Sequence, residues 1–188
     1  MIRADILEAA AQVFREKGYH AASMNDIAQA VNLQKASLYH HITSKQEMLH
    51  ALLDLGIDLL YERIAAVAAN ELPPSDKLSL CIQTYLDTLA EHADLAAVLL
   101  FEHRSLDDAL RAQHFPRRDR FEDVWREIIL EGVHSGVFTG PDPGLTAKYL
   151  LGVLNWTVTW YRQDGPLTSA EIAQTFSRLL LDGLLPRT

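Results

Sequence analysis

Apolar residues recur at spacings of three and four residues along almost the whole chain, and this periodicity restricts its fold more than any other feature. It is clear in residues 2–17 and again in residues 48–67. Alternation of apolar and polar residues, the mark of a half-buried strand, is nowhere convincing. With 188 residues and 48% hydrophobic content, the chain can bury a substantial core. The sequence therefore predicts an all-α protein.

Residues that start and end helices divide the N-terminal part into short pieces. Gly18 ends the first helical stretch as a C-cap. Ser23 begins the next stretch as an N-cap, with Asp26 three positions later as its capping-box partner. Asn32 then occupies a turn position at which asparagine tolerates the left-handed conformation. A third short helix is expected at about residues 34–41.

A long helix opens at Ser44 and runs to about residue 69, before Pro73-Pro74 makes the clearest break in the chain. Beyond that break, further helices are predicted at about residues 75–92, 95–103, 116–135, 143–163 and 168–183. We expect an N-terminal domain of residues 1–50, joined by the long helix to a C-terminal helical domain of residues 51–188.

Charge and cysteine content narrow the class of protein. Residues 1–50 carry five basic and five acidic side chains, so the rest of the chain holds the whole net charge of −8. Any anion-binding function should therefore lie in the N-terminal quarter. The single Cys81 excludes an intramolecular disulfide and fits a reducing cytosol. No signal peptide is evident, and polar residues interrupt the apolar stretch at 145–161, so we expect a cytoplasmic protein that does not contact the membrane.

Enzymatic residue patterns are not found in the sequence. It offers no paired nucleophile and base and no glycine-rich phosphate loop. A metal site from His40, His41 and His50 is disfavoured, because adjacent histidines on a helix diverge by about 100°. Neither a cysteine nor a well-spaced carboxylate completes such a site. We therefore expect a protein that is not an enzyme and requires neither a metal nor a cofactor.

Three short helices, with a turn at residues 31–34 between the second and third, describe a helix-turn-helix. Lys35 and Ser37 can reach base edges or phosphates from the start of the third helix, where the helix dipole favours anions. Tyr39 and His40 can donate hydrogen bonds to backbone oxygens of DNA. Lys45 is placed to contact a phosphate from the next helix. The sequence therefore predicts binding to double-stranded DNA.

The segment "ILEAAAQVFREKGYHAASMNDIAQAVNLQKASLYHHITSKQEML" resembles the DNA-binding domain of TetR-family transcriptional regulators. The residues that carry the resemblance are Ala9, Ala10, Phe14, Gly18, Tyr19, Asp26, Ile27, Ala28, Lys35, Leu38, Tyr39, His41, Ser44 and Lys45. The resemblance implies phosphate contacts from Ser23 and Tyr39. It also implies a major-groove face that comprises Gln34, Lys35, Ala36, Ser37 and His40. The sequence departs from the family at Asn32, Gln34, Ala36 and Ile42, so its operator cannot be copied from a relative.

Homodimerisation is expected, because one helix-turn-helix reads few base pairs and such domains work as two-fold dimers on palindromes. The resemblance implies that the last two helices form a four-helix bundle with those of the partner. The apolar residues of these helices that are predicted at the interface are Leu150, Val153, Leu154, Ile172, Phe176, Leu179 and Leu180. Sequence alone does not separate residues that face a partner from residues of the protomer core.

A ligand site is expected in the C-terminal domain. Asn155, Trp156, Trp160 and Arg162 lie on the predicted penultimate helix and suit a long apolar ligand with a polar head. The tryptophans could instead be packing residues. Arginines that could hold the phosphates of a coenzyme A are Arg104, Arg117, Arg118 and Arg120, although neighbouring carboxylates could simply pair with them.

The C-terminal sequence is similar to the TetR branch that responds to acyl-CoA thioesters of lipid, steroid or aromatic-acid catabolism. That resemblance implies a repressor that a hydrophobic effector, an acyl-CoA, releases from its operator. The alternative is a drug- or lipophile-sensing repressor of an efflux pump. In either case the ligand would change the spacing of the two recognition helices, which must lie about 34–36 Å apart to dock on DNA.

Overall fold

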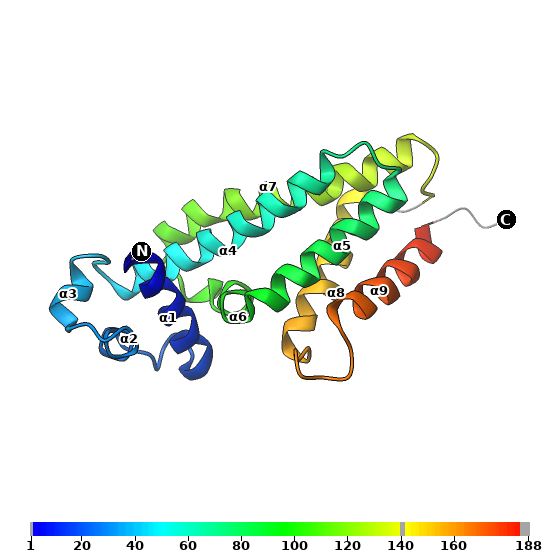
Figure 1. The fold of residues 1–188 in the computed structure, drawn as a ribbon. Helices are drawn as coiled ribbons and strands as arrows, with labels where there is room; N and C mark the ends of the chain where they lie inside the picture. Colours follow the sequence, from blue (N-terminus) through cyan, green and yellow to red (C-terminus); the bar gives the residue numbers. More distant parts are fainter. Residues whose placement is uncertain (1, 140–141, 185–188) are drawn as a thin grey trace. The chain divides into compact units, whose positions relative to one another are not determined.

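The computed structural model describes residues 2–139 and 142–184, and α-helices dominate them (Figure 1). The helices are α1 (Ile2–Lys17), α2 (Met24–Ala30), α3 (Lys35–Tyr39), α4 (Lys45–Ala68), α5 (Pro74–Glu91), α6 (Ala93–Phe101), α7 (Asp108–His134), α8 (Pro143–Trp156) and α9 (Ser169–Leu184), with 3-10 turns η1 (His103–Ser105) and η2 (Thr157–Thr159). The predicted fold, a helix-turn-helix domain followed by a long helix and a helical C-terminal domain, is confirmed.

The chain packs into two compact units. The first unit comprises residues 1–58 and 92–117, and the second comprises residues 59–91 and 118–188. Both α4 and α7 are therefore shared: each begins in the first unit and continues into the second. The first unit thus includes more residues than the predicted N-terminal domain. The boundary near residue 50 was predicted for the DNA-binding function, and it stays a prediction.

The first unit is organised around α1. Its inward face carries Ile6, Ala10 and Phe14, which are all buried. α1 packs along α6 and against α2, which in turn contacts α3 (Figure 1). Gly18 takes the left-handed conformation with a φ of 76°, and its N–H donates to the Phe14 carbonyl at 2.9 Å. The predicted C-cap of the first helix is therefore confirmed.

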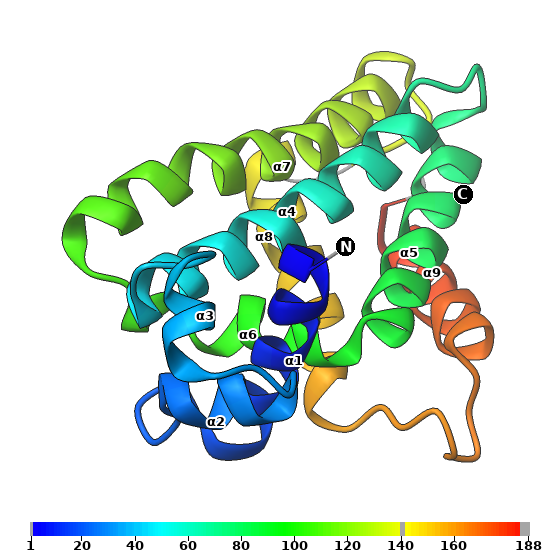
Figure 2. The ribbon, with the colours of Figure 1, turned by 60° about the vertical axis from the view of Figure 1, so that its left-hand side comes forward.

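The second unit has α5 packed along α9 (Figure 2). Its core holds an aromatic cluster of Tyr85, Phe121 and Trp125, with ring centroids 5.8–6.3 Å apart. The Tyr85 hydroxyl donates to Asn155 Oδ1 at 2.5 Å and so joins α5 to α8. Burial raises the pKa of Tyr85, which keeps that hydroxyl protonated as a donor.

The boundaries of α7 and α8 differ from the prediction. α7 begins at Asp108 instead of about residue 116, and it passes through Pro116, which the sequence suggested as a helix start. Asp107 stabilises this early start, because its carboxylate accepts from the Leu110 N–H at 2.9 Å. α8 ends at Trp156 instead of about residue 163, where the Thr157 hydroxyl donates to the Leu154 carbonyl and a 3-10 turn follows.

Gly132 in α7 makes a close packing contact possible. A Cβ atom at this position would overlap the ring of Phe138, which is buried. Alanine normally stabilises a helix interior by about 1 kcal/mol over glycine. Here we expect Gly132→Ala to lower the free energy of unfolding by about 1–3 kcal/mol, because Phe138 must leave its site. Urea denaturation at fixed protein concentration measures this change. A stabilised variant would contradict the packing.

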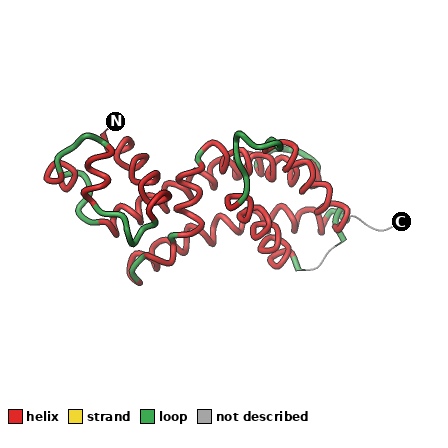
Figure 3. The backbone as a smooth tube through the Cα atoms, turned by 90° about the horizontal axis from the view of Figure 1, so that it is seen from below, coloured by secondary structure: helices red, strands yellow, loops and turns green. Residues whose placement is uncertain are grey.

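Strands are not found among residues 2–139 and 142–184 (Figure 3). No helix in these two ranges combines the length and apolar character that a bilayer crossing requires.

Candidate DNA-binding surface and effector domain

The start of α2 is fixed by a capping box. The Ser23 side chain accepts from the Asp26 N–H at 3.2 Å, and Asp26 accepts from the Ser23 N–H at 2.8 Å. Lys17 donates to the same carboxylate at 2.7 Å. Hydrogen bonds from Lys17 and then from Ser23 lower the pKa of Asp26 to about 2. The carboxylate is therefore ionised at neutral pH, and the capping box predicted for this helix is confirmed.

The turn between α2 and α3 is a Schellman motif. Asn32 lies in the left-handed region with a φ of 53°, as predicted. Its N–H donates to the Gln29 carbonyl at 3.1 Å, and the Leu33 N–H donates to the Ala28 carbonyl at 2.8 Å. Asparagine thus replaces the usual turn glycine without changing the kind of turn. The motif closes α2 and sends the chain directly into α3.

α3 has one buried anchor and an exposed polar face. Leu38 is 0% exposed and attaches the short helix to the rest of the first unit. The predicted DNA-facing residues on the other sides are Gln34, Lys35, Ala36, Tyr39 and His40, which are exposed, and Ser37, which is half-buried. The Lys35 ammonium lies 6.0 Å from the centre of the Tyr39 ring. This face presents a cation, hydroxyls, an amide and an imidazole, which suits contact with phosphates and base edges.

Ser23 is exposed just before α2, as a phosphate contact requires. Lys45, the other predicted phosphate contact outside α3, is instead directed at backbone carbonyls. The Lys45 ammonium donates to the carbonyls of Tyr19 and Ala22 at 2.8 Å each and to that of His20 at 3.4 Å. It also lies 4.3 Å from the centre of the Tyr19 ring. Its three donors are therefore engaged within the first unit. Lys45 holds the loop before α2, and phosphate contact by this residue stays a prediction.

The C-terminal residues predicted to bind a ligand do not lie on one helix. Trp156 is 66% exposed, and the 3-10 turn η2 separates it from Trp160, so the two rings do not share a helix face. Asn155 instead accepts the hydrogen bond from Tyr85. Arg162 pairs with Asp164 in an exposed loop at 3.0 Å. The prediction placed all four residues on one continuous helix through residue 163, but α8 ends at Trp156.

The predicted arginines have different surroundings. In the first unit, Arg104 is exposed, and Arg117 contacts Asp58 and Asp54 on α4. In the second unit, Arg118 is exposed, and the Arg120 guanidinium stacks 3.8 Å from the centre of the Tyr61 ring. Of the four, Arg120 alone lines a groove of about 390 Å³. The groove is lined by Tyr61, Ala65, Ala68, Arg120, Asp123, Val124, Glu127, Ile128 and Glu131.

Most residues of this groove were not predicted from the sequence. Its α4 side carries the small residues Ala65 and Ala68 three positions apart, a spacing that places them on one helix face. That signal is weak, because alanines on a helix usually report helix propensity alone.

Most residues predicted at the dimer interface lie inside the protomer. Leu150, Leu154, Ile172 and Leu180 are buried, whereas Val153 and Phe176 are half-buried. Leu179 is 65% exposed and can face a partner. Other large apolar side chains are exposed on α8, namely Leu145, Tyr149 and Trp156. The sequence left open which of these residues face a partner, and the burial of Leu150, Leu154, Ile172 and Leu180 places those four in the protomer core.

The single cysteine of the chain is buried in the second unit. Burial raises the pKa of the Cys81 thiol to about 12, so it is not a reactive thiolate at neutral pH. Within the two described ranges, no three His, Cys, Asp or Glu side chains are grouped so that they could hold a metal ion.

Comparison with known proteins identifies the family. Residues 6–52 match the model for bacterial regulatory proteins of the tetR family, and residues 71–184 match the tetracyclin repressor-like C-terminal domain. The repressor KstR2 of Mycobacterium tuberculosis is 29% identical over 97% of this chain and 92% of its own.

Two solved structures are similar over nearly full length. The TetR-family regulator PfmR of Thermus thermophilus is 35% identical, with a TM-score of 0.89 over 96% of this chain and 99% of its own. AibR, solved with isovaleryl coenzyme A and operator DNA, is 29% identical, with a TM-score of 0.90 over 97% of this chain and 100% of its own. The chain therefore belongs to the TetR family, and it is a helix-turn-helix DNA-binding transcriptional repressor rather than an enzyme.

Proposed function

We propose that the protein acts in the cytoplasm as a homodimer on a palindromic operator and that an acyl-CoA thioester releases it. The observation that carries the DNA-binding part is the exposed polar face of α3, presented by the buried anchor Leu38 and the Schellman turn at Asn32. Gln34, Lys35, Ala36, Ser37 and His40 would enter the major groove, and Tyr39 and Ser23 would contact phosphates.

Exposed apolar residues support dimerisation. Leu145, Tyr149 and Trp156 on α8 are spaced four and seven residues apart, which places them along one face of the helix. Leu179 is similarly exposed on α9. Large apolar side chains grouped in this way on a water-facing surface mark an interaction site. Two copies would cover these faces with a four-helix bundle and bring two recognition helices onto one duplex.

Relatives support the choice of an acyl-CoA effector. AibR was crystallised with isovaleryl coenzyme A, and the structure of KstR2, 26% identical to this chain, is described as that of a ketosteroid regulator. In the second unit, Arg120 is the cation that lines the groove and the residue we assign to a phosphate or carbonyl of the thioester. The groove also carries three carboxylates, Asp123, Glu127 and Glu131, which favours contact with one end of the ligand rather than with all its phosphates.

The test is release of the protein from a duplex selected from a random pool, followed by fluorescence anisotropy. Isovaleryl-CoA, benzoyl-CoA and palmitoyl-CoA are compared with free coenzyme A and with the cationic lipophile rhodamine 6G. We expect at least one thioester to release the duplex and free coenzyme A to leave it bound. Release by rhodamine 6G alone would favour the efflux-pump alternative. Release by none of them would contradict the effector while leaving the DNA-binding function intact.

Arg120 gives the effector assignment a residue-level prediction. We expect Arg120→Ala to raise the thioester concentration needed for half-release by about 10- to 150-fold, because a charge-assisted hydrogen bond contributes about 1.5–3 kcal/mol. Arg15→Ala, which removes an exposed arginine from the first unit, is the control and should leave half-release unchanged. If both variants required the same thioester concentration for half-release, the assignment of Arg120 to the effector site would be wrong.

A further inference from the structure

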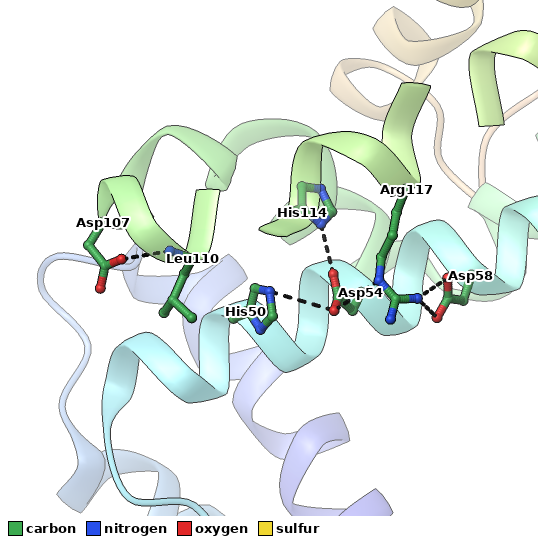
Figure 4. Close-up of polar contacts among 7 residues, drawn as sticks. All are labelled: His50, Asp54, Asp58, Asp107, Leu110, His114 and Arg117. Atoms are coloured by element: carbon green, nitrogen blue, oxygen red, sulfur yellow. Dashed lines mark hydrogen bonds and ion pairs between the residues drawn. The ribbon is translucent and has the colours of Figure 1, made fainter. Parts of the chain in front are cut away.

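A polar cluster joins α4 to α7 inside the first unit (Figure 4). We call it the Asp54 network, and its members are His50, Asp54 and Asp58 on α4 and His114 and Arg117 on α7. His114 Nδ1 lies 2.9 Å from Asp54 Oδ1, and Arg117 Nε lies 3.3 Å from Asp54 Oδ2. Arg117 also donates to both oxygens of Asp58 at 2.6 and 2.7 Å. Asp54 is thus shared between two side chains of the opposite helix.

Burial makes an unpaired polar group costly at the centre of the Asp54 network. His114 is 1% exposed, although it is a polar residue. His50 Nε2 is buried without a hydrogen-bond partner and lies 3.6 Å from Asp54 Oδ2. The carboxylates of Asp58 and Asp54 raise the pKa of Arg117, so its guanidinium stays protonated at neutral pH. Removing Asp54 leaves the buried His114 without its partner, which is costly. Arg117 and Asp58 are about half exposed, so their ion pair holds the geometry through the contact that Arg117 also makes with Asp54.

The position of the cluster along the two helices is informative. The first unit ends at Asp58 in α4 and at Arg117 in α7, so the ion pair between these residues joins the last first-unit position of each helix. Pro116, which immediately precedes Arg117, has no N–H to donate to the Ala112 carbonyl. α7 therefore lacks one helix hydrogen bond at this point, and side-chain contacts must supply rigidity there.

The other side of α4 is held just as closely. A Cβ atom on Gly56 would lie 3.3–3.5 Å from Leu99 and Leu95 of α6, so glycine allows α6 to approach the α4 backbone. Residues 54–58 of α4 are thus fixed by α6 on one side and by the Asp54 network on another. The helix that continues from the helix-turn-helix is clamped where it leaves the first unit.

We propose that Asp54, His114 and Arg117 are positioning residues for operator binding. They fasten the first ten residues of α7 to α4, so that both helices leave the first unit as one fixed pair. The direction of that pair sets the separation of the two recognition helices in a dimer. We do not expect any of these three side chains to contact DNA. The proposal rests on the proposed function as a dimer.

This role differs measurably from a phosphate contact. Losing a phosphate contact lowers the slope of log affinity against log salt by about 0.9. Losing a positioning residue should leave that slope unchanged. It should also spare binding to a single half-site, because each helix-turn-helix keeps its own shape, and weaken binding to the full palindrome, which requires correct spacing.

The experiment measures the affinity of His114→Leu, Arg117→Ala, Asp58→Ala and the Asp58→Ala/Arg117→Ala pair for full-site and half-site duplexes at several salt concentrations. We expect full-site affinity to fall about tenfold in His114→Leu and Arg117→Ala, which lose a contact with Asp54, and by less in Asp58→Ala, whose pair with Arg117 is exposed. Half-site affinity should stay within about twofold, and the two single changes at Asp58 and Arg117 should be non-additive. His114→Asn, which keeps a donor toward Asp54, should restore most of the full-site affinity. Arg63→Ala, which breaks a similar α4 ion pair with Glu91 in the second unit, is the matched control.

Two outcomes would overturn the proposal: variants that bind the full site like the wild type, or variants whose half-site affinity falls equally. Wild-type protein that shows no preference for the full site would instead contradict the dimeric function. Amide hydrogen exchange separates these cases without DNA. Residues 109–117 should lose protection in Arg117→Ala and His114→Leu but not in Arg63→Ala. Unchanged protection would show that the Asp54 network does not fasten α7 to α4.

Discussion

Replacing Lys35 and Tyr39 together by alanine should weaken binding to the selected duplex by about 30- to 150-fold, since each contact of this kind contributes about 1–1.5 kcal/mol. Both side chains belong to the exposed face of α3, and neither supports the core. The fold should therefore survive, with unchanged helical circular dichroism. If Lys35 contacts a phosphate, the salt slope should fall by about 0.9 and all sequences should be weakened alike. If it reads a base, the loss should depend on sequence.

The control for this experiment is Arg15→Ala. It removes one positive charge from the same unit, but on α1, where Arg15 pairs with Asp94 at 2.5 Å. We expect its affinity to stay within about twofold of the wild type, because an exposed pair of this kind contributes little. Equal losses in the two variants would show a general charge effect and would exclude a specific role for α3.

Trp125→Ala should produce the largest loss of stability, about 3–5 kcal/mol in the free energy of unfolding. Trp125 is 0% exposed, and its ring meets Tyr85 and Phe121 edge to face in the core of the second unit. Removing it leaves a cavity that the surrounding helices cannot close. Urea denaturation measures the loss, at one fixed protein concentration because the stability of the proposed dimer would depend on concentration.

Trp125→Phe tests the origin of that loss. The Trp125 Nε1–H is buried without a hydrogen-bond partner, and an unpaired buried donor costs about 1–3 kcal/mol. Phenylalanine keeps most of the apolar contact and removes this donor, so its loss should be less than half that of alanine. Phe101→Ala, at an exposed aromatic on α6, should change stability by about 0.5 kcal/mol or less. A Phe101→Ala loss as large as that of Trp125→Ala would contradict the assigned core.

Local chemistry made the N-terminal domain predictable. The Ser23–Asp26 capping box, the Gly18 C-cap and the left-handed Asn32 each depend on residues within a few positions of one another. Their signals are therefore complete in a short window of sequence. Leu38 and the polar residues around it then follow from helical periodicity, which places one face inward and the others outward.

Long-range packing explains what the sequence did not show. α7 continues through Pro116 because His114 and Arg117 contact carboxylates that lie about sixty positions earlier, on α4. By contrast, α8 stops at Trp156 through a local contact, in which the Thr157 hydroxyl donates to the Leu154 carbonyl, and helical periodicity did not reveal this end. Trp160 therefore lies beyond the helix on which it was predicted. The outward faces of α8 and α9 could not be told from the sequence, because periodicity gives a helix its apolar stripes but not which stripe meets the protomer core.

The most direct test of the account is dimethyl sulfate footprinting of the selected duplex, which reads guanine N7 in the major groove and adenine N3 in the minor groove. If α3 enters the major groove of each half-site, guanine N7 should be protected in two patches about 10 base pairs apart. Lys35→Ala should weaken both patches. Protection confined to adenine N3, or a uniform pattern without two patches, would contradict the placement of α3 in the major groove.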